Sequence, residues 1–335
     1  MTEDYIRLFS QTAIADLDKN TMVSIKKSED VEKLLSVLYE NSLSSLPVID
    51  GEGKRVIGFV DTNDVLSLLA KLKLSSDSSD DDIRLYSIGF LNSNVNNIMD
   101  EKKKDQFVVV LEEQSLFEVL KLYANGVHRL ALLTVFSDIE NIVSQSNVIK
   151  FLNNNLSVLG QLGDTTIGSS LIKPFLPSKE SLITTKSSTL TIDSFKIMNT
   201  HKCSAIPVLE DSTNKIIGTL SVNDLYGINQ STIKLLLNPT GEFINLDNSK
   251  IKSNKNKPNH QIVLKLNNTF KEAIQIISNN KVHRIWIVDD NNIPISLISL
   301  TDICKIIVEA PYLLEDQQTN NNQRNSDNST TNQNK

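Results

Sequence analysis

Two stretches of nineteen residues with the same layout decide the fold of this chain: residues 46–64, LPVIDGEGKRVIGFVDTND, and residues 206–224, IPVLEDSTNKIIGTLSVND. Each contains an apolar run of β-forming residues, a polar turn, a second apolar run and an Asp where a helix is expected to begin. First-strand residues of this kind recur at intervals of 84, 76 and 79 residues: Leu46, Leu130, Ile206 and Ile285. Helix-start residues recur at intervals of 83, 77 and 78 residues: Asp64, Asn147, Asp224 and Asp302. The two series run in step, which indicates that one unit is used four times.

An amphipathic helix is expected in front of each strand pair. Apolar residues at i, i+3, i+4 and i+7 occur within residues 31–38, 116–123 and 270–277, with a weaker pattern within residues 192–198. A unit this small buries little apolar area alone, so we expect the repeats to pack in pairs. The predicted fold class is α/β in the broad sense (α+β), with short sheets flanked by helices. The border between the two pairs is predicted near residues 157–164, and the four units are predicted to cover residues 15–75, 83–157, 165–237 and 240–312.

Three polar stretches are predicted to lie outside the packed units. Residues 75–82 hold only Ser and Asp, and residues 248–260 are rich in Lys, Asn and Ser, which is typical of linkers or surface insertions. Residues 317–335 contain no apolar side chain and many Asn and Gln. We therefore expect residues 315–335 to form a disordered Asn/Gln-rich tail.

The composition excludes several classes of protein. Of the 335 residues 39% are apolar, and 34 Lys plus Arg stand against 40 Asp plus Glu, without a basic run that could follow a nucleic-acid backbone. Two cysteines are too few for a disulfide-built module or a four-Cys metal site. The acidic N-terminus does not resemble a secretory signal, and charges interrupt the apolar residues 293–314. We expect no nucleic-acid, membrane or metal partner, and location in the cytoplasm, with the nucleus as an alternative compartment.

The acidic residues at the expected helix starts allow two interpretations. Ser221 and Ser299 stand three residues before Asp224 and Asp302, which is the spacing of a capping box. In the other interpretation the helix starts face a cleft, where Asp64, Asp224 and Asp302 bind the hydroxyls of a ribose and the helix amides favour an anion. The repetition of the pattern is compatible with both.

Two His-Arg pairs favour the second interpretation. The chain has only six Arg and four His. Yet Val127-His128-Arg129-Leu130 and Val282-His283-Arg284-Ile285 stand at the same place in the second and fourth units. An Arg fork beside an imidazole suits phosphate, because its hydrogen bonds are charge-assisted. A carboxylate for ribose together with a His-Arg pair for phosphate predicts a nucleotide-binding site in a cleft between units.

On these residues the unit resembles the cystathionine-β-synthase (CBS) repeat, whose paired form is the Bateman module. Four copies with Val-His-Arg in both even units are similar to the gamma regulatory subunit of AMP-activated and sucrose-non-fermenting-type protein kinases, over roughly residues 15–312. The resemblance implies two Bateman modules in a flattened disc. It also implies a non-catalytic regulatory subunit that binds the adenine nucleotides AMP, ADP or ATP, needs no other cofactor, and acts with kinase alpha and beta subunits in energy sensing.

The resemblance further implies roles for individual residues. In that family the Asp at the start of the second helix holds the ribose, the hydroxyl residue three before it lies by the phosphate, and the His-Arg pairs reach a central phosphate channel. Carried over to this chain, the nucleotide-binding residues are Asp64, His128, Arg129, Ser221, Asp224, His283, Arg284, Ser299 and Asp302.

Three positions depart from the family pattern. Asn147 replaces the ribose Asp in the second unit, where the gamma family also lacks it, so three usable sites are implied. Asp61 replaces the hydroxyl residue in the first unit, where a carboxylate should repel a phosphate. Ser44 stands where kinase gamma subunits often present another Arg, so we expect a central channel less positive than theirs.

Two hypotheses of function from different classes remain. The first is a nucleotide-sensing regulatory subunit of a Ser/Thr protein kinase. The second is a stand-alone CBS-repeat adaptor or inhibitor with degenerate nucleotide sites, which the three departures favour more than a perfect match to the family would. An enzyme is not expected, because the chain has no Gly-x-x-x-x-Gly-Lys-Ser/Thr loop, no His-Glu-x-x-His and no Gly-x-Ser-x-Gly.

Overall fold

Four three-stranded sheets, one from each predicted unit, form the framework of the protein. The computed structural model describes residues 3–17, 22–51, 55–99, 108–133, 139–246 and 261–310. In every sheet the first strand runs parallel to the second, and the second pairs antiparallel with the third. The strands are β1 (Ile25–Lys26), β2 (Ser45–Asp50), β3 (Arg55–Asp61), β4 (Val109–Leu111), β5 (Arg129–Leu133), β6 (Ile139–Ser144), β7 (Thr185–Lys186), β8 (Ala205–Leu209), β9 (Ile216–Ser221), β10 (Val263–Leu264), β11 (Arg284–Val288) and β12 (Pro294–Ser299). The predicted strand pairs are confirmed, and the short parallel strand of each sheet is an addition to them.

The helices that lead into the strand pairs lie where the apolar periodicity predicts them: α2 (Val31–Asn41), α6 (Leu116–Ala124), α9 (Thr191–Thr200) and α11 (Phe270–Asn280). Each buries one apolar face, as α2 does with Val31, Leu34, Leu35 and Leu38. At the start of α2 the Asp30 side chain accepts the Lys33 backbone N–H at 2.8 Å, which satisfies a donor that the helix itself leaves unpaired.

A left-handed residue follows each of these helices at the same position of the unit. The φ angles are 55°, 90°, 54° and 52° for Ser42, Gly126, Lys202 and Lys281. This conformation turns the chain from the helix into the strand. Only one of the four is glycine, although a side chain in this conformation costs roughly 1–2 kcal/mol.

The second helix of each unit follows its antiparallel strand pair. It is α3 (Thr62–Leu69) in the first unit, α7 (Gln145–Asn154) in the second, and a helix over residues 300–310 in the fourth. In the third unit the helix expected at Asp224 is a short 3₁₀ helix, η5 (Val222–Gly227). Gly227 ends this element, because glycine is a poor helix former.

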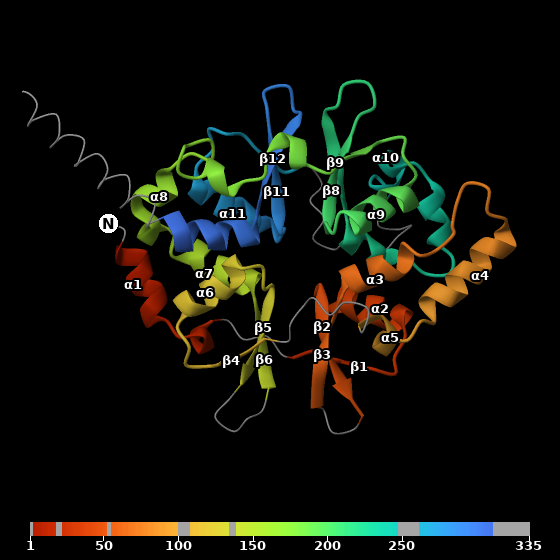
Figure 1. Ribbon diagram of the computed structural model, residues 1–335, viewed down its shortest axis with the longest axis horizontal. Helices are drawn as coiled ribbons and strands as arrows, with labels where there is room; N and C mark the ends of the chain where they lie inside the picture. Colours follow the sequence, from red (N-terminus) through yellow and green to blue (C-terminus); the bar gives the residue numbers. More distant parts are fainter. Residues whose placement is uncertain are drawn as a thin grey trace, which may run out of the picture.

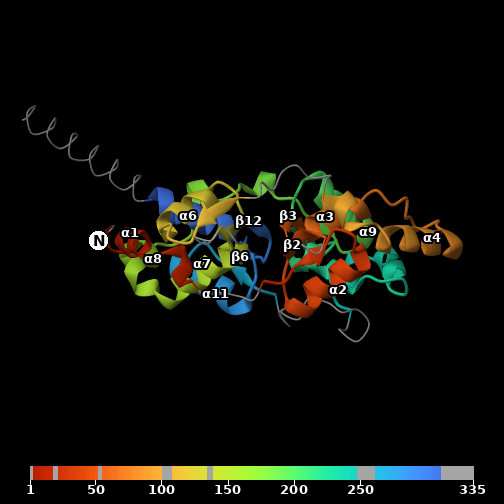
Figure 2. The ribbon, with the colours of Figure 1, turned by 90° about the horizontal axis from the view of Figure 1, so that it is seen from below.

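Each unit packs against two others. Figure 1 shows the sheets of units one and two side by side, and those of units three and four side by side, as two Bateman modules. Two large apolar cores cross between the modules: one joins units two and four together with α1 (Glu3–Gln11), and the other joins units one and three. The predicted packing in pairs is confirmed, and the edge view in Figure 2 shows the resulting flattened disc.

Smaller helices connect the units, and one of them begins within the stretch predicted as a linker or surface insertion. Ser79 caps α4 (Asp80–Leu91), so residues 80–82 begin a helix instead of completing a linker; acidic residues are favourable at a helix start. The predicted border near residues 157–164 is also helical, in η2 (Leu156–Leu159) and α8 (Gly160–Asp164), because Leu159 and Leu162 are buried in a core. The remaining short elements are η1 (Ile14–Asp16), α5 (Val95–Met99), η3 (Lys173–Phe175), η4 (Lys179–Ser181), η6 (Ile233–Leu237) and α10 (Thr240–Phe243).

Two predicted polar segments fall outside the residues that the structure describes. These are the stretch at residues 248–260 and the tail at residues 315–335. Within the described ranges, no helix is both long and apolar enough to span a bilayer.

Candidate ligand-binding site

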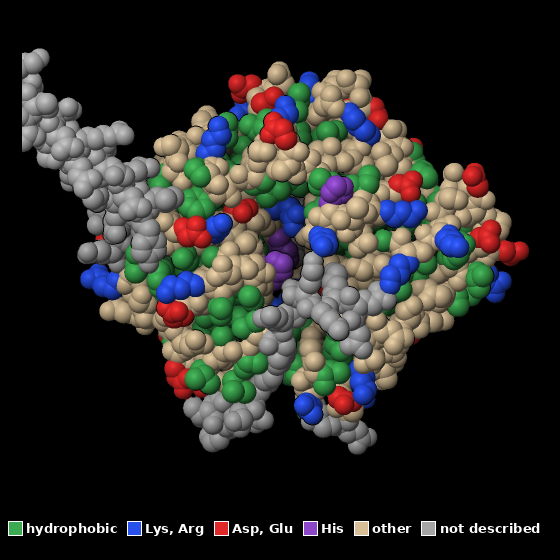
Figure 3. Space-filling view, in the orientation of Figure 1, with side chains coloured by type: hydrophobic (Ala, Val, Ile, Leu, Met, Phe, Trp, Pro, Cys, Tyr) green, Lys and Arg blue, Asp and Glu red, His purple; other side chains and the backbone are tan. Residues whose placement is uncertain are grey.

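One large cavity lies where the four units meet. Its volume of about 1710 Å³ exceeds the roughly 300–1,000 Å³ of ordinary small-molecule pockets. Its described lining comes from all four units and includes five Lys or Arg side chains against three Asp, so it favours an anion. Figure 3 shows the opening as a hollow at the centre of the disc, with histidine and basic side chains inside it.

Eight of the nine residues predicted for the site line this cavity. They are His128, Arg129, Ser221, Asp224, His283, Arg284, Ser299 and Asp302. Asp64 is not among the lining residues; its side chain is buried at the start of α3. The fold therefore gathers the predicted residues of three units in one place and leaves out the acid of the first unit.

The capping interpretation of the helix starts is confirmed in every unit. The side chain three residues after the cap accepts the cap's backbone N–H at 2.9, 3.0, 2.8 and 2.8 Å for Asp64, Asn147, Asp224 and Asp302 respectively. Burial raises the pKa of Asp302, although hydrogen bonds from Ser299 act in the opposite direction. Because a carboxylate has two acceptor oxygens, capping by one of them does not exclude a ribose contact, which stays a prediction.

Arg129 is held by the first unit of its own module. Its Nη2 atom lies 3.7 Å from Oδ2 of Asp61, and the two side chains are only 13% and 6% exposed. The guanidinium carbon lies 5.8 Å from the centre of the Phe59 ring, within the range of a cation–π contact. Asp61, predicted only as a group that repels phosphate, is thus also the counter-ion of Arg129.

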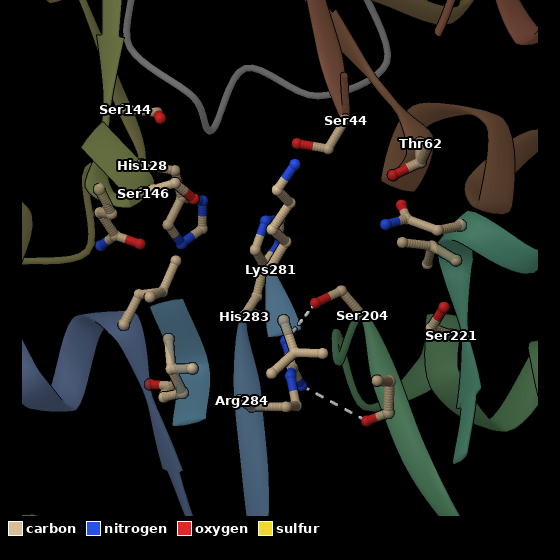
Figure 4. A pocket seen from close by; sticks show the side chains of 18 of the residues that line it. Ser44, Thr62, His128, Ser144, Ser146, Ser204, Ser221, Lys281, His283 and Arg284 are labelled. Carbon is tan, nitrogen blue, oxygen red and sulfur yellow. Dashed lines mark hydrogen bonds between the residues drawn. The ribbon is translucent and has the colours of Figure 1, made fainter. Parts of the chain in front are cut away.

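Arg284 has different partners in the other module. Its guanidinium donates to the Ser204 hydroxyl and, at 3.4 Å, to the Ala205 carbonyl, which ties β11 to β8 (Figure 4). Among the described residues no carboxylate lies within ion-pair distance of it. The two Arg residues occupy equivalent positions of the repeat, but only one of them is neutralised by an acid.

The imidazoles of His128 and His283 both point into the cavity (Figure 4). The pKa of His283 is lowered to about 4, first by desolvation within the surrounding protein and then by the positive charges of Arg284, Arg129 and His128. His128, Arg129, His283 and Arg284 all line this cavity, so the fold brings the two His-Arg pairs together there. At neutral pH the His283 imidazole is therefore uncharged, with one donor and one acceptor nitrogen for a ligand.

Lys281 is a cavity residue that the sequence did not reveal. It follows α11 in the left-handed conformation, and in Figure 4 its side chain points across the cavity toward Ser44 of the first unit. Lysine is common at a helix C-terminus, because the helix dipole favours a cation there. No signal in the sequence therefore distinguished Lys281 from the other lysines of the chain. Hydroxyl groups of Ser44, Ser144 and Ser146 also surround the cavity in this view.

The described part of the chain contains no cluster of three or more His, Cys, Asp and Glu side chains that could hold a metal ion.

Comparison with known families defines the class of protein. The CBS domain family matches residues 14–71, 176–228 and 258–309. The second unit lies outside these matches, but its sheet has the same strand order and directions as the other three. Three of the four units therefore contain CBS domains, and the second unit shares the arrangement of their sheets.

Relatives of known name fall into two groups. The chain is 27% identical over 285 residues to Protein SDS23 of Eremothecium gossypii, covering 81% of this chain and 58% of that protein. It is 26% identical over 303 residues to Protein SDS23 of Saccharomyces cerevisiae, covering 85% and 56% of the two chains. It is also 25% identical over 229 residues to the SNF1-related protein kinase regulatory subunit gamma-like PV42b of Arabidopsis thaliana, covering 58% and 62%. The chain thus spans somewhat more than half the length of the SDS23 proteins.

Solved structures confirm the arrangement of the four repeats. Protein MJ1225 of Methanocaldococcus jannaschii, described as an archaeal homologue of g-AMPK, superposes with a TM-score of 0.65 at 15% identity, over 88% of this chain and 99% of that one. A conserved protein of Pyrococcus horikoshii gives a TM-score of 0.52 at 15% identity, over 89% and 100%. At this identity the likeness is one of fold.

Proposed function

We propose that this protein is a non-catalytic regulatory subunit that binds an adenine nucleotide, AMP, ADP or ATP, in the central cavity and passes its occupancy to a Ser/Thr protein kinase. The observation that carries the proposal is the convergence of two His-Arg pairs with Asp224 and Asp302 on one cavity. Phosphate donors and ribose acceptors then lie in the same space. The name of the gamma-like relative supports a kinase, through its alpha and beta subunits, as the partner in energy sensing.

Binding in this cavity would act on the contact between the two modules. His128 belongs to the first module and Arg284 to the second, so a ligand that contacts both would join them. A partner that prefers the joined arrangement then binds more tightly when nucleotide is present. By linkage the partner must strengthen nucleotide binding by the same factor.

A second candidate function is a stand-alone adaptor or inhibitor with degenerate nucleotide sites. The Asp61–Arg129 ion pair favours it, because it neutralises one of the two arginines expected to bind phosphate. In that case the protein would act through its surfaces and not through the cavity.

The test is a calorimetric titration of the chain with AMP, ADP and ATP at fixed salt. We expect roughly micromolar binding, from two or three charge-assisted contacts together with burial of the base. The double variant His128→Gln/His283→Gln should bind at least about tenfold more weakly. His201→Gln is the matched control, since His201 is exposed and does not line the cavity.

Absence of binding to all three nucleotides by the folded chain would contradict the proposal and favour the adaptor. Affinity purification from cells separates the two candidates independently. Recovery of kinase alpha and beta subunits supports the first candidate, and recovery of an unrelated partner without them supports the second.

A further inference from the structure

The basic side chains of the cavity are not equally available to a ligand. Arg129 is paired with Asp61, and Arg284 donates to Ser204 and Ala205. The ammonium groups of two lysines in the lining, Lys202 and Lys281, make no hydrogen bond or ion pair with any residue in the described ranges. Their charges therefore remain for a bound anion.

The two lysines occupy the same left-handed turn in units three and four, with φ of 54° and 52°. In the equivalent turns the first unit has Ser42 and the second has Gly126. Lys281 differs from Lys202 in its sequence neighbourhood, because it stands two residues before His283, whereas Lys202 stands two residues before Ser204. Of the two lysines, Lys281 is the one that adjoins a His-Arg pair in its own unit.

The Lys281 side chain points into the centre of the cavity. Figure 4 shows its ammonium group pointing toward the Ser44 hydroxyl of the first unit, into the space that His128 and His283 also face. Ser44 directly precedes β2, at the position that His128 and His283 hold before β5 and β11. The first unit thus contributes a hydroxyl to the centre of the cavity, and the fourth unit contributes the positive charge there.

We propose that Lys281 is the principal phosphate-binding cation of this cavity and that it supplies from the fourth unit the charge that the first unit lacks at Ser44. The ligand is a nucleotide whose phosphates lie between Lys281, Ser44 and the two imidazoles. This inference rests on the proposed nucleotide binding and names the residue that selects for phosphate. Because a second or third phosphate adds charge at this point, the contribution of Lys281 increases from AMP to ATP.

A purely structural role for Lys281 makes different predictions. A cation at the end of α11 interacts favourably with the helix dipole, and loss of that interaction lowers stability without changing ligand preference. Lys281→Gln is the informative variant. It removes the charge at nearly the same length and leaves the backbone preference of the turn similar.

The experiment compares four proteins by calorimetric titration with ATP, AMP and adenosine: the unaltered chain, Lys281→Gln, Lys202→Gln and the charge-relocated variant Lys281→Gln/Ser44→Lys. We expect Lys281→Gln to weaken ATP binding by at least about tenfold and to change adenosine binding by less than about twofold. Lys202→Gln should weaken ATP binding less, and the relocated lysine at residue 44 should restore most of the ATP affinity.

An equal loss for ATP and adenosine in Lys281→Gln would overturn the proposal, because Lys281 would then act on the fold and not on the phosphate. An equal loss of ATP affinity in Lys202→Gln and Lys281→Gln would also overturn it, because ATP binding would then depend on the total positive charge of the cavity and not on a specific contact with Lys281. Inorganic tripolyphosphate separates this inference from the proposed function. If the unaltered chain binds tripolyphosphate through Lys281 but no nucleotide, the anion site stands and the nucleotide function fails; if it binds neither ligand, both fail.

Discussion

Asp61 and Arg129 face each other within the first module, with the carboxylate Oδ2 3.7 Å from the guanidinium Nη2. The equivalent residues of the second module are Ser221 and Arg284, and no carboxylate replaces the hydroxyl there. The pair is almost fully shielded from solvent, so salt screens it little. The first module therefore carries its own anion beside the arginine expected to bind phosphate, and the second module does not.

Replacement of Asp61 should open the first module to ligands. Asp61→Ser keeps a residue that can cap α3 and gives the hydroxyl found at the equivalent Ser221. We expect ATP affinity to rise by about three- to tenfold, because Arg129 loses its internal counter-ion. Without ligand the protein should lose on the order of 1–3 kcal/mol of unfolding free energy, since a mostly buried arginine is left unpaired.

Calorimetry and urea unfolding measure the two effects of Asp61→Ser. Asp50→Ser is the matched control, because it removes one carboxylate from an exposed ion pair with Lys27. Weaker ATP binding in Asp61→Ser would contradict the prediction.

The two possible roles of Asp224 and Asp302 can be separated with asparagine. In the second unit Asn147 already accepts the cap N–H of Ser144 at 3.0 Å, so asparagine preserves the cap. Asp224→Asn and Asp302→Asn should therefore unfold within about 0.5 kcal/mol of the unaltered chain, whereas loss of a cap costs about 1 kcal/mol. If the carboxylates hold ribose, the preference of the two variants for ATP over 2′-deoxy-ATP should be about tenfold smaller than that of the unaltered chain.

Asp64→Asn serves as the control for this comparison, because Asp64 caps α3 but does not line the cavity. It should change neither stability nor binding. An unchanged preference for the ribose hydroxyl in both Asp224→Asn and Asp302→Asn leaves these acids with the capping role alone.

Arg284 should prove to be a structural residue as well as a ligand-binding one. Its hydrogen bonds to Ser204 and the Ala205 carbonyl join β11 to β8, beside the small apolar cluster that includes Ala205 and Trp286. Arg284→Gln should lower the unfolding free energy by about 2 kcal/mol, because a buried carbonyl loses a charged donor. Urea unfolding measures the loss, and Arg7→Gln, from an exposed pair with Asp4, should lose less than about 0.5 kcal/mol. Equal stability of the two variants would show that Arg284 contributes nothing to the fold.

Stability should depend on the protonation of His283. Its pKa in the folded protein is about 4, below the ordinary value of 6.5, so between these pH values the unfolded chain binds more protons than the folded one. The unfolding free energy should therefore fall as the pH decreases from about 6.5 toward 4. His283→Gln removes the titrating group and should show a shallower decrease, measured by urea unfolding at pH 7.5, 6 and 5. Identical pH profiles would mean that His283 does not contribute to this dependence.

Local patterns explain why so much of the fold could be predicted. Helices such as α11 appear in the sequence as apolar residues at helical spacing, and strand pairs such as β8 and β9 as apolar runs around a polar turn. The wrong expectations also have local causes. Residues 80–82 were predicted as part of a linker because Ser and Asp are common in linkers. The same acidic residues favour a helix start once the apolar face of α4 has a surface to pack on.

The sequence by itself determined the four copies of the unit, their strand pairs, the capped helix starts and the register of the two His-Arg pairs, because all of these depend on spacing within about twenty residues. Only the tertiary structure decided that Asp61 neutralises Arg129, that Asp64 does not line the cavity, and that Lys281 points toward Ser44. These relationships join residues of different units. They are decided by how the packed cores orient the units toward one another, which no local spacing encodes.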